Sequence, residues 1–386
     1  MDFGHKILNE WYLDESVVFL NNGSFGATPK VVLEAQFEII RKLEREPLTF
    51  FLDDYNELLN IASVRLAGFV GSEVENIVFV ENATTGVNTV LRSLINEINP
   101  GDELLTTNHV YPGVKNAMQY VADKTGAKYV EADIPFHIDG SAQIAEIIKK
   151  SLNEKTKIAV FDHITSPTAI IFPVKELIEI CHAYNTIVVI DGAHTPGMLE
   201  LNIEELKPDF YTGNCHKWMF TPKGCAFLWV NKNYHDEINP LCISLDYNKG
   251  FRQEFAWTGT KNPSSWLVVP ESINFYEKFG KNEIMSYNHK LAIEARNEIL
   301  NTLHLDKPCS DDMIGSMASF EMPGNLEINP HSQFELRKHF LKEYRIELPF
   351  IVFDNKLLFR VSAQIFNEIE DIYKLIDAIE DFNKTR

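Results

Sequence analysis

The feature that most constrains the fold is a short run of consecutive branched apolar side chains near the middle of the chain. Ile187, Val188, Val189 and Ile190 follow one another without a polar residue, and Asp191 comes directly after them. A run of this length and β-branched composition indicates a strand that is buried on both faces, which is typical of a parallel sheet covered by helices. The sequence therefore predicts a buried strand that ends in a carboxylate.

Similar apolar runs alternate with helix-spaced patterns from about residue 75 onward. This alternation predicts an α/β fold with a largely parallel sheet that is covered on both faces by helices. The last run follows the turn Pro222-Lys223-Gly224, and we expect it to form an edge strand. The predicted strands are residues 77–80, 103–106, 128–131, 157–162, 187–191, 210–211 and 225–230, and the predicted helices are residues 84–98, 114–124 and 174–184.

The pattern changes after about residue 271, where one long helical segment, weakly interrupted at Gly280, extends to residue 303. The rest predicts a smaller α+β unit that this helix joins to the first. Its predicted strands are residues 317–321, 351–353 and 357–361, and its predicted helices are residues 334–344 and 367–383. We therefore divide the chain into an N-terminal arm (1–20), a large α/β domain (21–272) and a small C-terminal α+β domain (273–386).

Charge and composition argue against several classes of protein. A formal net charge of −19 disfavours a nucleic-acid partner, because binding to a phosphate backbone relies on lysine and arginine. The N-terminus lacks the order of a signal peptide, and no apolar run approaches the roughly 18 residues of a membrane span. The five cysteines and twelve histidines show no spacing for a disulfide framework or a metal. We expect a cytoplasmic protein with no metal, no membrane contact and no nucleic-acid partner.

Lys217 follows Asp191 on a later predicted loop, after one short strand. A buried carboxylate and a loop lysine are the pair that a pyridoxal 5′-phosphate (PLP) enzyme requires. The lysine amine forms a Schiff base with the cofactor aldehyde, and the carboxylate keeps the pyridine nitrogen protonated so that the ring accepts electrons. We therefore expect PLP as the cofactor, with Lys217 and Asp191 as the catalytic pair.

Other predicted strands end in groups that suit the same cofactor, since open α/β sheets bind ligands at the carboxyl ends of their strands. Thr84 and Thr85 open a predicted helix, where backbone N–H groups and two hydroxyls favour a phosphate. Threonine there is also a common helix cap. His109 and Tyr111 follow strand 103–106, and either ring could stack on the pyridine ring or pack on the core.

Ser166 and His194 follow two further predicted strands. Each could hydrogen-bond the phenolic oxygen of PLP, and each could equally satisfy local backbone groups. Each group is ambiguous by itself, but together they place cofactor-binding chemistry at one edge of the predicted sheet.

These residues resemble the class V aminotransferase family of fold-type I PLP enzymes, and within it the isopenicillin N epimerase-like branch. The likeness covers nearly the whole chain. The resemblance implies the PLP-transferase fold with a large, mostly parallel seven-stranded sheet. It also implies that Asn22 and Ser24 bind substrate and that Asn214 and His216 help to hold the cofactor, with His216 at the phosphate. The matching segments are residues 19–26 (Phe-Leu-Asn-Asn-Gly-Ser-Phe-Gly), 83–85 (Ala-Thr-Thr), 162–168 (Asp-His-Ile-Thr-Ser-Pro-Thr), Asp191-x-x-His194 and His216-Lys217.

Two further segments match the family. Residues 257–261 (Trp-Thr-Gly-Thr-Lys) resemble a turn that reaches the cofactor phosphate of a neighbouring subunit, which implies a homodimer with Gly259 and Thr260 beside the partner's cofactor. Residues 358–363 (Leu-Phe-Arg-Val-Ser-Ala) resemble the segment whose arginine, here Arg360, binds the substrate α-carboxylate. The planar guanidinium suits that task because it pairs with both carboxylate oxygens. The implied substrate is a small amino acid or amino-acid-like molecule.

The sequence constrains the reaction less than the cofactor. PLP eases loss of the Cα proton, and Lys217 is the expected general base for epimerisation, elimination or transamination. The motif resemblance favours an isopenicillin N epimerase-like activity. The alternatives are a carbon–sulfur lyase or a class V aminotransferase and, more remotely, a catalytically silent binding protein. A cysteine desulfurase is disfavoured, because residues 310–360 contain no cysteine that a mobile loop could present.

Overall fold

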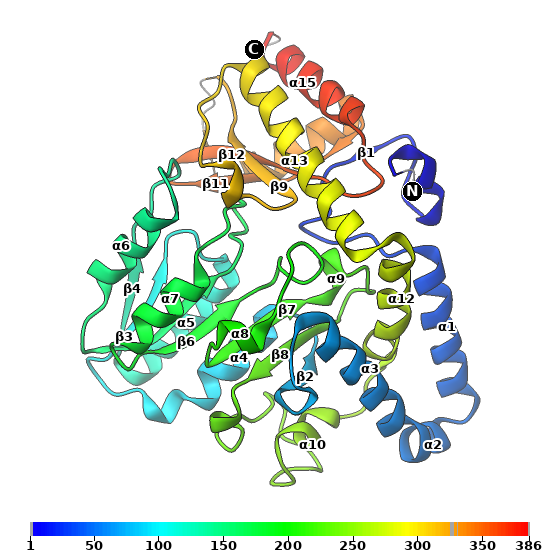
Figure 1. Cartoon of the computed structure of the whole chain (residues 1–386), viewed down its shortest axis with the longest axis vertical. Helices are drawn as coiled ribbons and strands as arrows, with labels where there is room; N and C mark the ends of the chain where they lie inside the picture. The colour runs from blue at the N-terminus through cyan, green and yellow to red at the C-terminus, as the bar shows by residue number, and fades with distance from the viewer. Residues whose placement is uncertain (1–2, 325–327, 330, 385–386) are drawn as a thin grey trace.

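The structure, a computed structural model, describes residues 3–324, 328–329 and 331–384, and a seven-stranded sheet forms its centre (Figure 1). The strand order is β2-β8-β7-β6-β5-β3-β4. Neighbouring strands are parallel except at β8, which is antiparallel to both β2 and β7. The predicted α/β fold with a mostly parallel seven-stranded sheet is confirmed. The bounds are β2 Ile77–Val80, β3 Glu103–Thr107, β4 Lys128–Ala132, β5 Thr156–Asp162, β6 Ile187–Asp191, β7 Phe210–Asn214 and β8 Ala226–Val230.

The strand β8 lies inside the sheet, so the prediction of an edge strand is wrong. All five of its residues are buried between β2 and β7. The edges are formed by β2 and β4 instead. The strand that pairs with the outer edge of β8 is β2, which comes from a distant part of the chain. The turn before β8 therefore carries no information about this pairing.

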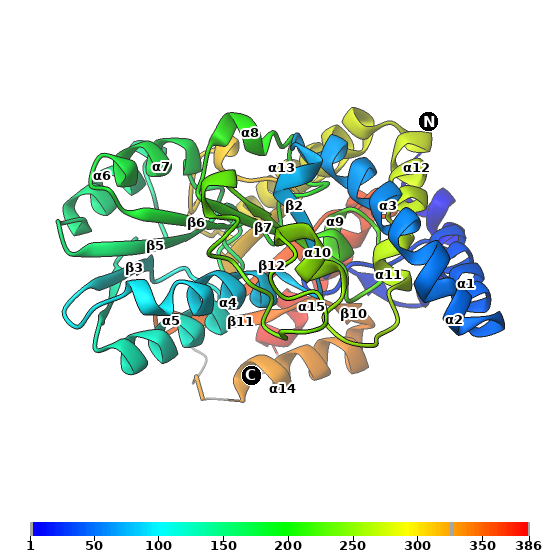
Figure 2. The same ribbon diagram turned by 90° about the horizontal axis from the view of Figure 1, so that it is seen from below.

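Helices cover both faces of the sheet, as Figure 2 shows from below. Successive strand residues point to opposite faces. In β5, Ile158 packs with the residues of α4 and α5, whereas Ala159 joins the cluster formed with α6 and α7. This double burial explains why the central strands are apolar throughout. The longer helices before the C-terminal unit are α1 Lys30–Arg45, α3 Tyr55–Val70, α4 Ala83–Ser93, α5 Pro112–Thr125, α6 Ser141–Ser151 and α7 Val174–His182, and the shorter ones are α2 Pro47–Thr49, α8 Ile203–Leu206, α9 Cys215–Trp218, α10 Phe251–Ala256 and α11 Ser264–Leu267.

The C-terminal unit contains a second, antiparallel sheet of order β11-β12-β9. The predicted long helix is two helices, because Gly280 between them has φ of 82°, a left-handed conformation that a continuous helix cannot contain. In the described part of the chain, no helix combines the length and apolar character needed to cross a membrane. The bounds are α12 Val269–Phe279, α13 Lys281–Leu303, β9 Met317–Glu321, α14 Ser332–His339 with a π-helical turn at Phe340–Tyr344, β10 Ile346–Glu347, β11 Phe350–Phe353, β12 Lys356–Ser362 and α15 Ile369–Lys384.

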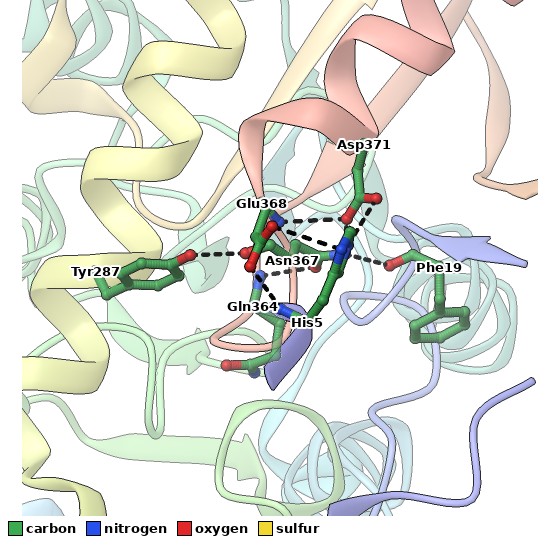
Figure 3. A network of polar contacts seen from close by, with 7 residues as sticks. All are labelled: His5, Phe19, Tyr287, Gln364, Asn367, Glu368 and Asp371. Atoms are coloured by element: carbon green, nitrogen blue, oxygen red, sulfur yellow. Dashed lines mark hydrogen bonds and ion pairs between the residues drawn. The ribbon is translucent and has the colours of Figure 1, made fainter. Parts of the chain in front are cut away.

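The N-terminal segment is attached to the C-terminal unit. Its short strand β1, Val18–Phe19, pairs in parallel with β10. His5 Nε2 lies 3.0 Å from Asp371 Oδ1, and Asn367 Nδ2 donates to the backbone oxygen of Phe19 at 3.1 Å. Figure 3 shows these contacts around the start of α15, where Tyr287 of α13 donates to the Asn367 oxygen at 2.7 Å. The segment is therefore held at both ends before it continues toward the large sheet.

Candidate active site

A cavity of about 620 Å³ opens at the carboxyl ends of the central strands. The strands β5, β6 and β7 end there in Asp162, Asp191 and Asn214, which is the edge where open α/β sheets bind ligands. A larger hollow of about 750 Å³ lies near α3 and α10, but none of the predicted site residues lines it. The predicted residues that line the first cavity are Ser24, Thr84, Tyr111, Ser166, Asp191, His194, Asn214, His216, Lys217 and Arg360.

Lys217 lies in the short helix α9, directly after β7, and its Nζ is 3.1 Å from His194 Nε2. Desolvation and the charge of Arg360 lower the pKa of Lys217 to about 7, although Asp191 and Asp162 oppose this shift. Burial and the two cations also hold the pKa of His194 well below its ordinary value. At neutral pH, a neutral imidazole therefore faces an amine that is available both as base and as acid.

Two carboxyl groups lie at the ends of neighbouring parallel strands, where Asp162 and Asp191 are register partners. The Oδ1 atom of Asp191 accepts a hydrogen bond from the Ala193 N–H at 2.9 Å. Burial raises the pKa of both carboxyl groups, and the charge of Asp191 raises the pKa of Asp162 further. Only Asp191 was predicted as a site residue, yet Asp162 also ends a buried strand and the same signal could have found it.

Arg360 is a buried cation on β12, and no carboxylate of the described residues pairs with it. Its side chain is 2 % exposed. The guanidinium donates to the Ser166 backbone oxygen, to Ser166 Oγ at 3.3 Å and to Ser24 Oγ at 3.1 Å, and its Nε has no partner in the described part of the chain. Burial lowers the pKa of Arg360 to about 10, so the group remains charged at neutral pH. Such a cation suits the binding of a carboxylate ligand.

The start of α4 forms one end of the cavity. Asn82 caps this helix, since its Oδ1 accepts from the Thr85 N–H at 2.8 Å, and Asn214 Oδ1 accepts from the Ala83 N–H at 2.8 Å. Thr84 lines the cavity, whereas the Thr85 hydroxyl also bonds Asn82 and does not line it. The cap is therefore Asn82, which was missed, and neither threonine is the helix cap that the alternative described.

His216 and Lys223 extend this end of the cavity. The Nδ1 atom of His216 donates to the Cys225 backbone oxygen at 2.8 Å, because a carbonyl can only accept, and this leaves Nε2 for a ligand. Burial and the charges of Lys217 and Lys223 lower the pKa of His216 to about 4. Together with the positive N-terminal end of α4, these groups could hold a phosphate. Lys223 was not predicted as a site residue.

His109 lies outside the cavity lining, so the structure does not bring it together with the other predicted cofactor-binding residues. Its Nδ1 is 2.7 Å from Thr168 Oγ1, its Nε2 is 2.9 Å from the Ile134 oxygen, and its ring packs on Phe353 at 4.6 Å. Both ring nitrogens are thus engaged inside the protein. Of the two candidate rings, Tyr111 is the one that lines the cavity.

Asn22 also lies outside the cavity lining, although it is fully buried. Its Nδ2 donates to the Lys217 backbone oxygen at 3.2 Å, and its Oδ1 accepts from the Ala27 N–H at 3.1 Å. Both ends of the amide are therefore used by the backbone. Asn22 fixes the N-terminal segment to α9, whereas Ser24, two residues later, lines the cavity.

Gly259 and Thr260 do not line the cavity either, but their turn lies at its rim. Lys261 Nζ is 3.2 Å from Glu81 Oε1, and Glu81 is a lining residue. Thr260 itself is exposed. Since the structure contains one chain, the predicted contact of Gly259 and Thr260 with a partner's cofactor stays a prediction.

Known proteins resemble the chain over almost its whole length. The family profile described as Aminotransferase class-V matches residues 19–348. Putative L-cysteine desulfhydrase 1 of Oryza sativa subsp. japonica is 31% identical, with 95% of this chain and 83% of that protein covered. Isopenicillin N epimerase of Streptomyces clavuligerus is 29% identical, with 95% of each covered. The solved complex of the cystine C-S lyase C-DES with its product cysteine persulfide has a TM-score of 0.82 at 22% identity, covering 95% of this chain and 98% of that one.

Proposed function

Because the chain belongs to the class-V aminotransferase family and its cofactor is pyridoxal 5′-phosphate, we propose that it is a carbon–sulfur lyase that acts on a cysteine-like L-amino acid. Cysteine desulfhydrase and C-S lyase are names carried by its relatives. The observation that carries the proposal is the similarity to a putative L-cysteine desulfhydrase over 95% of this chain. The contact of 3.1 Å between the Lys217 amine and the neutral His194 imidazole supplies the base that the reaction needs. Elimination needs a base that takes the Cα proton and an acid that protonates the departing sulfur, and an amine with a pKa of about 7 can serve as either at neutral pH.

The cavity residues fit the cofactor. Asp191 is a buried acid suited to the pyridine nitrogen, Lys217 to the aldehyde, and Tyr111 to the ring face. The start of α4 and His216 suit the phosphate. PLP supplies, when bound, an electron sink that acidifies the Cα–H bond of an attached amino acid.

Different side chains of the protein then bind the substrate and transfer its proton. Arg360 binds the α-carboxylate, and Ser24 and Ser166 hold its guanidinium in place through the hydrogen bonds already described. Lys217 takes the Cα proton and His194 keeps the amine oriented. In the net reaction the Cα–H and Cβ–S bonds break, the sulfur leaves as a thiol, and water converts the remainder to a 2-keto acid and ammonia.

An isopenicillin N epimerase-like activity, which the sequence favours, is the second candidate. The similarity to the Streptomyces clavuligerus epimerase supports it. Epimerisation requires that a proton reach Cα from the face opposite to the one that lost it. The phenol of Tyr111, which lines the cavity and is 44% exposed, is the candidate donor for that second face.

Proton NMR in D₂O of the PLP-loaded protein with L-cysteine, S-alkyl cysteines and other L-amino acids tests the proposal. We expect release of thiol and keto acid, with no D-isomer, and Tyr111→Phe should retain this activity within a few-fold. Loss of the α-proton signal with a growing D-isomer and no keto acid would establish the epimerase instead. In that case Tyr111→Phe should abolish the exchange.

A further inference from the structure

Asp162 and Asp191 form a buried pair of carboxyl groups at the base of the cavity, only 4% and 3% exposed. They are register partners on neighbouring parallel strands, so their side chains project from the same face of the sheet. Two adjacent carboxylates with so little water cannot both carry a charge without a large electrostatic cost. One of the two must hold a proton or be neutralised by a partner.

The hydrogen bonds of the pair identify the group that holds the proton. Asp191 Oδ1 accepts from the Ala193 N–H at 2.9 Å. Asp162 Oδ2 is buried, and no donor of the described residues reaches it. A buried carboxylate oxygen without a donor is costly, whereas a protonated carboxyl oxygen supplies its own hydrogen and needs only an acceptor. Asp191, the register partner of Asp162, offers the neighbouring carboxylate that can accept it.

We infer that Asp162 carries a proton at neutral pH and donates it in a hydrogen bond to Asp191, so that the two groups act as a single acid pair with one negative charge. The charged groups facing Asp162 are Asp191 on β6 and Lys217 on α9. Lys217 and the backbone N–H of Tyr111 favour ionisation of Asp162, but burial and the charge of Asp191 oppose it more strongly. His163 follows Asp162 in the chain, and its Nδ1 atom is engaged in a hydrogen bond of 2.9 Å with the Tyr211 hydroxyl.

The Asp162–Asp191 pair affects the protonation of the cofactor ring. This step rests on the proposed placement of Asp191 beside the pyridine nitrogen. An Asp191 carboxylate that accepts hydrogen bonds from Ala193 and Asp162 stays ionised and keeps a fixed orientation. It is also a weaker base than an isolated buried carboxylate, so Asp162 tunes how firmly the ring nitrogen keeps its proton. Asp162 is therefore a positioning residue that acts through Asp191, whether the reaction is elimination or epimerisation.

The pH dependence of stability tests the proton on Asp162 without any cofactor or turnover. A carboxyl group whose pKa is raised by folding contributes stability that is complete below the unfolded value of about 3.9 and is lost as pH rises through the folded pKa. Asp162→Asn keeps the shape and an N–H donor but cannot ionise. We therefore expect the melting temperature of D162N, relative to wild type, to increase steadily from pH 4 to pH 7 in cofactor-free protein.

Asp123→Asn, on the exposed side of α5, is the matched control with the same side-chain replacement. The melting temperature of D123N, relative to wild type, should stay constant over the same pH range. A constant melting-temperature difference between D162N and wild type would overturn the inference, because Asp162 would then titrate alike in the folded and unfolded chain. A failure of the lyase proposal leaves this measurement unaffected.

Infrared spectroscopy of wild type labelled with [4-¹³C]aspartate provides a second test that does not depend on the folding of a variant. We expect a C=O band of a protonated carboxyl group at pH 7 that moves with the isotope. The band should be lost in D162N and retained in D123N. Its absence from the wild-type protein would contradict the inference.

Discussion

Arg360 shows how burial and missing partners turn a common side chain into a specific binding group. The guanidinium is held by two serine hydroxyls and a backbone oxygen, which are neutral, so its charge stays uncompensated within the described part of the chain. Desolvation makes an uncompensated cation unfavourable until an anion arrives. Carboxylate binding by Arg360 is therefore our proposal, and in it the planar shape of the guanidinium matters as much as its charge.

Replacing Arg360 with lysine separates shape from charge. We expect Arg360→Lys to weaken binding of amino-acid substrates by about 1.5–3 kcal/mol, the scale of a charge-assisted hydrogen bond, which is roughly ten- to hundredfold in KM. The matching α-amides, which lack the carboxylate, should bind the variant and wild type alike. Steady-state kinetics on acid and amide pairs measures how strongly each protein prefers the amino acid to its α-amide. If Arg360→Lys keeps the preference of wild type for the acid, the carboxylate site must lie at another residue.

The sequence could predict where a residue lies when that residue directly follows or ends a buried strand. Lys217 and Asp191 follow buried strands, and the end of a strand fixes the edge of the sheet at which they lie. His109 and Tyr111 stand two residues apart after the same strand, and only contacts with the distant Ile134 and Phe353 draw His109 into the interior. Such long-range contacts leave no local pattern.

Helix α4 depends on a close approach to the sheet that few residues permit. An added Cβ on Gly86 would lie 2.3 Å from Thr212 Oγ1 of β7, and that hydroxyl is fixed by a hydrogen bond of 2.7 Å to the Phe227 oxygen. The start of α4 therefore rests directly on the strand that precedes Lys217. This contact couples the proposed phosphate site to the proposed catalytic lysine.

Gly86→Ala should disturb both the packing of α4 on β7 and the proposed phosphate site at the start of α4. We expect overpacking to cost about 1–3 kcal/mol of unfolding free energy and to weaken PLP binding, because α4 must shift away from β7. Gly68→Ala is the control, since Gly68 in helix α3 has open space around it and alanine should stabilise that helix by up to about 1 kcal/mol. Denaturant unfolding and PLP titration measure the two effects. Normal PLP affinity in Gly86→Ala would contradict this role of α4.

Among the elements, the central strands were easiest to predict, because burial on both faces makes them uniformly apolar. The helices α1, α3 and α6 lie outside the predicted pattern. In α3, buried residues such as Ala62, Leu66 and Phe69 are mixed with buried Ser63, so no clean apolar stripe marks the helix. The position of β8 depends on its pairing with β2, which lies far away in the sequence.

At the scale of the whole molecule, the site is assembled from all parts of the chain. The N-terminal segment brings Ser24, the large sheet brings Asp191 and Lys217, and the C-terminal unit brings Arg360 on β12. The contacts of His5 with α15 tie the first and last of these together (Figure 3). The assignment of three domains and a cytoplasmic location remain predictions from the sequence.

A homodimer is the prediction that belongs to this scale. Thr260 is exposed on a turn that Lys261 holds at the rim of the cavity, which leaves it free to approach a second chain. Sedimentation velocity should give a mass of twice the 44.2 kDa of one chain. Thr260→Ala should remain dimeric and bind PLP less tightly. A monomer that is fully loaded with PLP would contradict both the dimer and the role of Thr260.

The most direct test of the central claim is borohydride reduction of the PLP-loaded protein, followed by peptide mapping with mass spectrometry. Reduction fixes the cofactor to the lysine that holds its aldehyde. Lys223 lines the same cavity and serves as an internal comparison. The structure predicts the modification on Lys217, in the peptide that follows β7. A modification on Lys223, or none on any lysine, would contradict the assignment of the site.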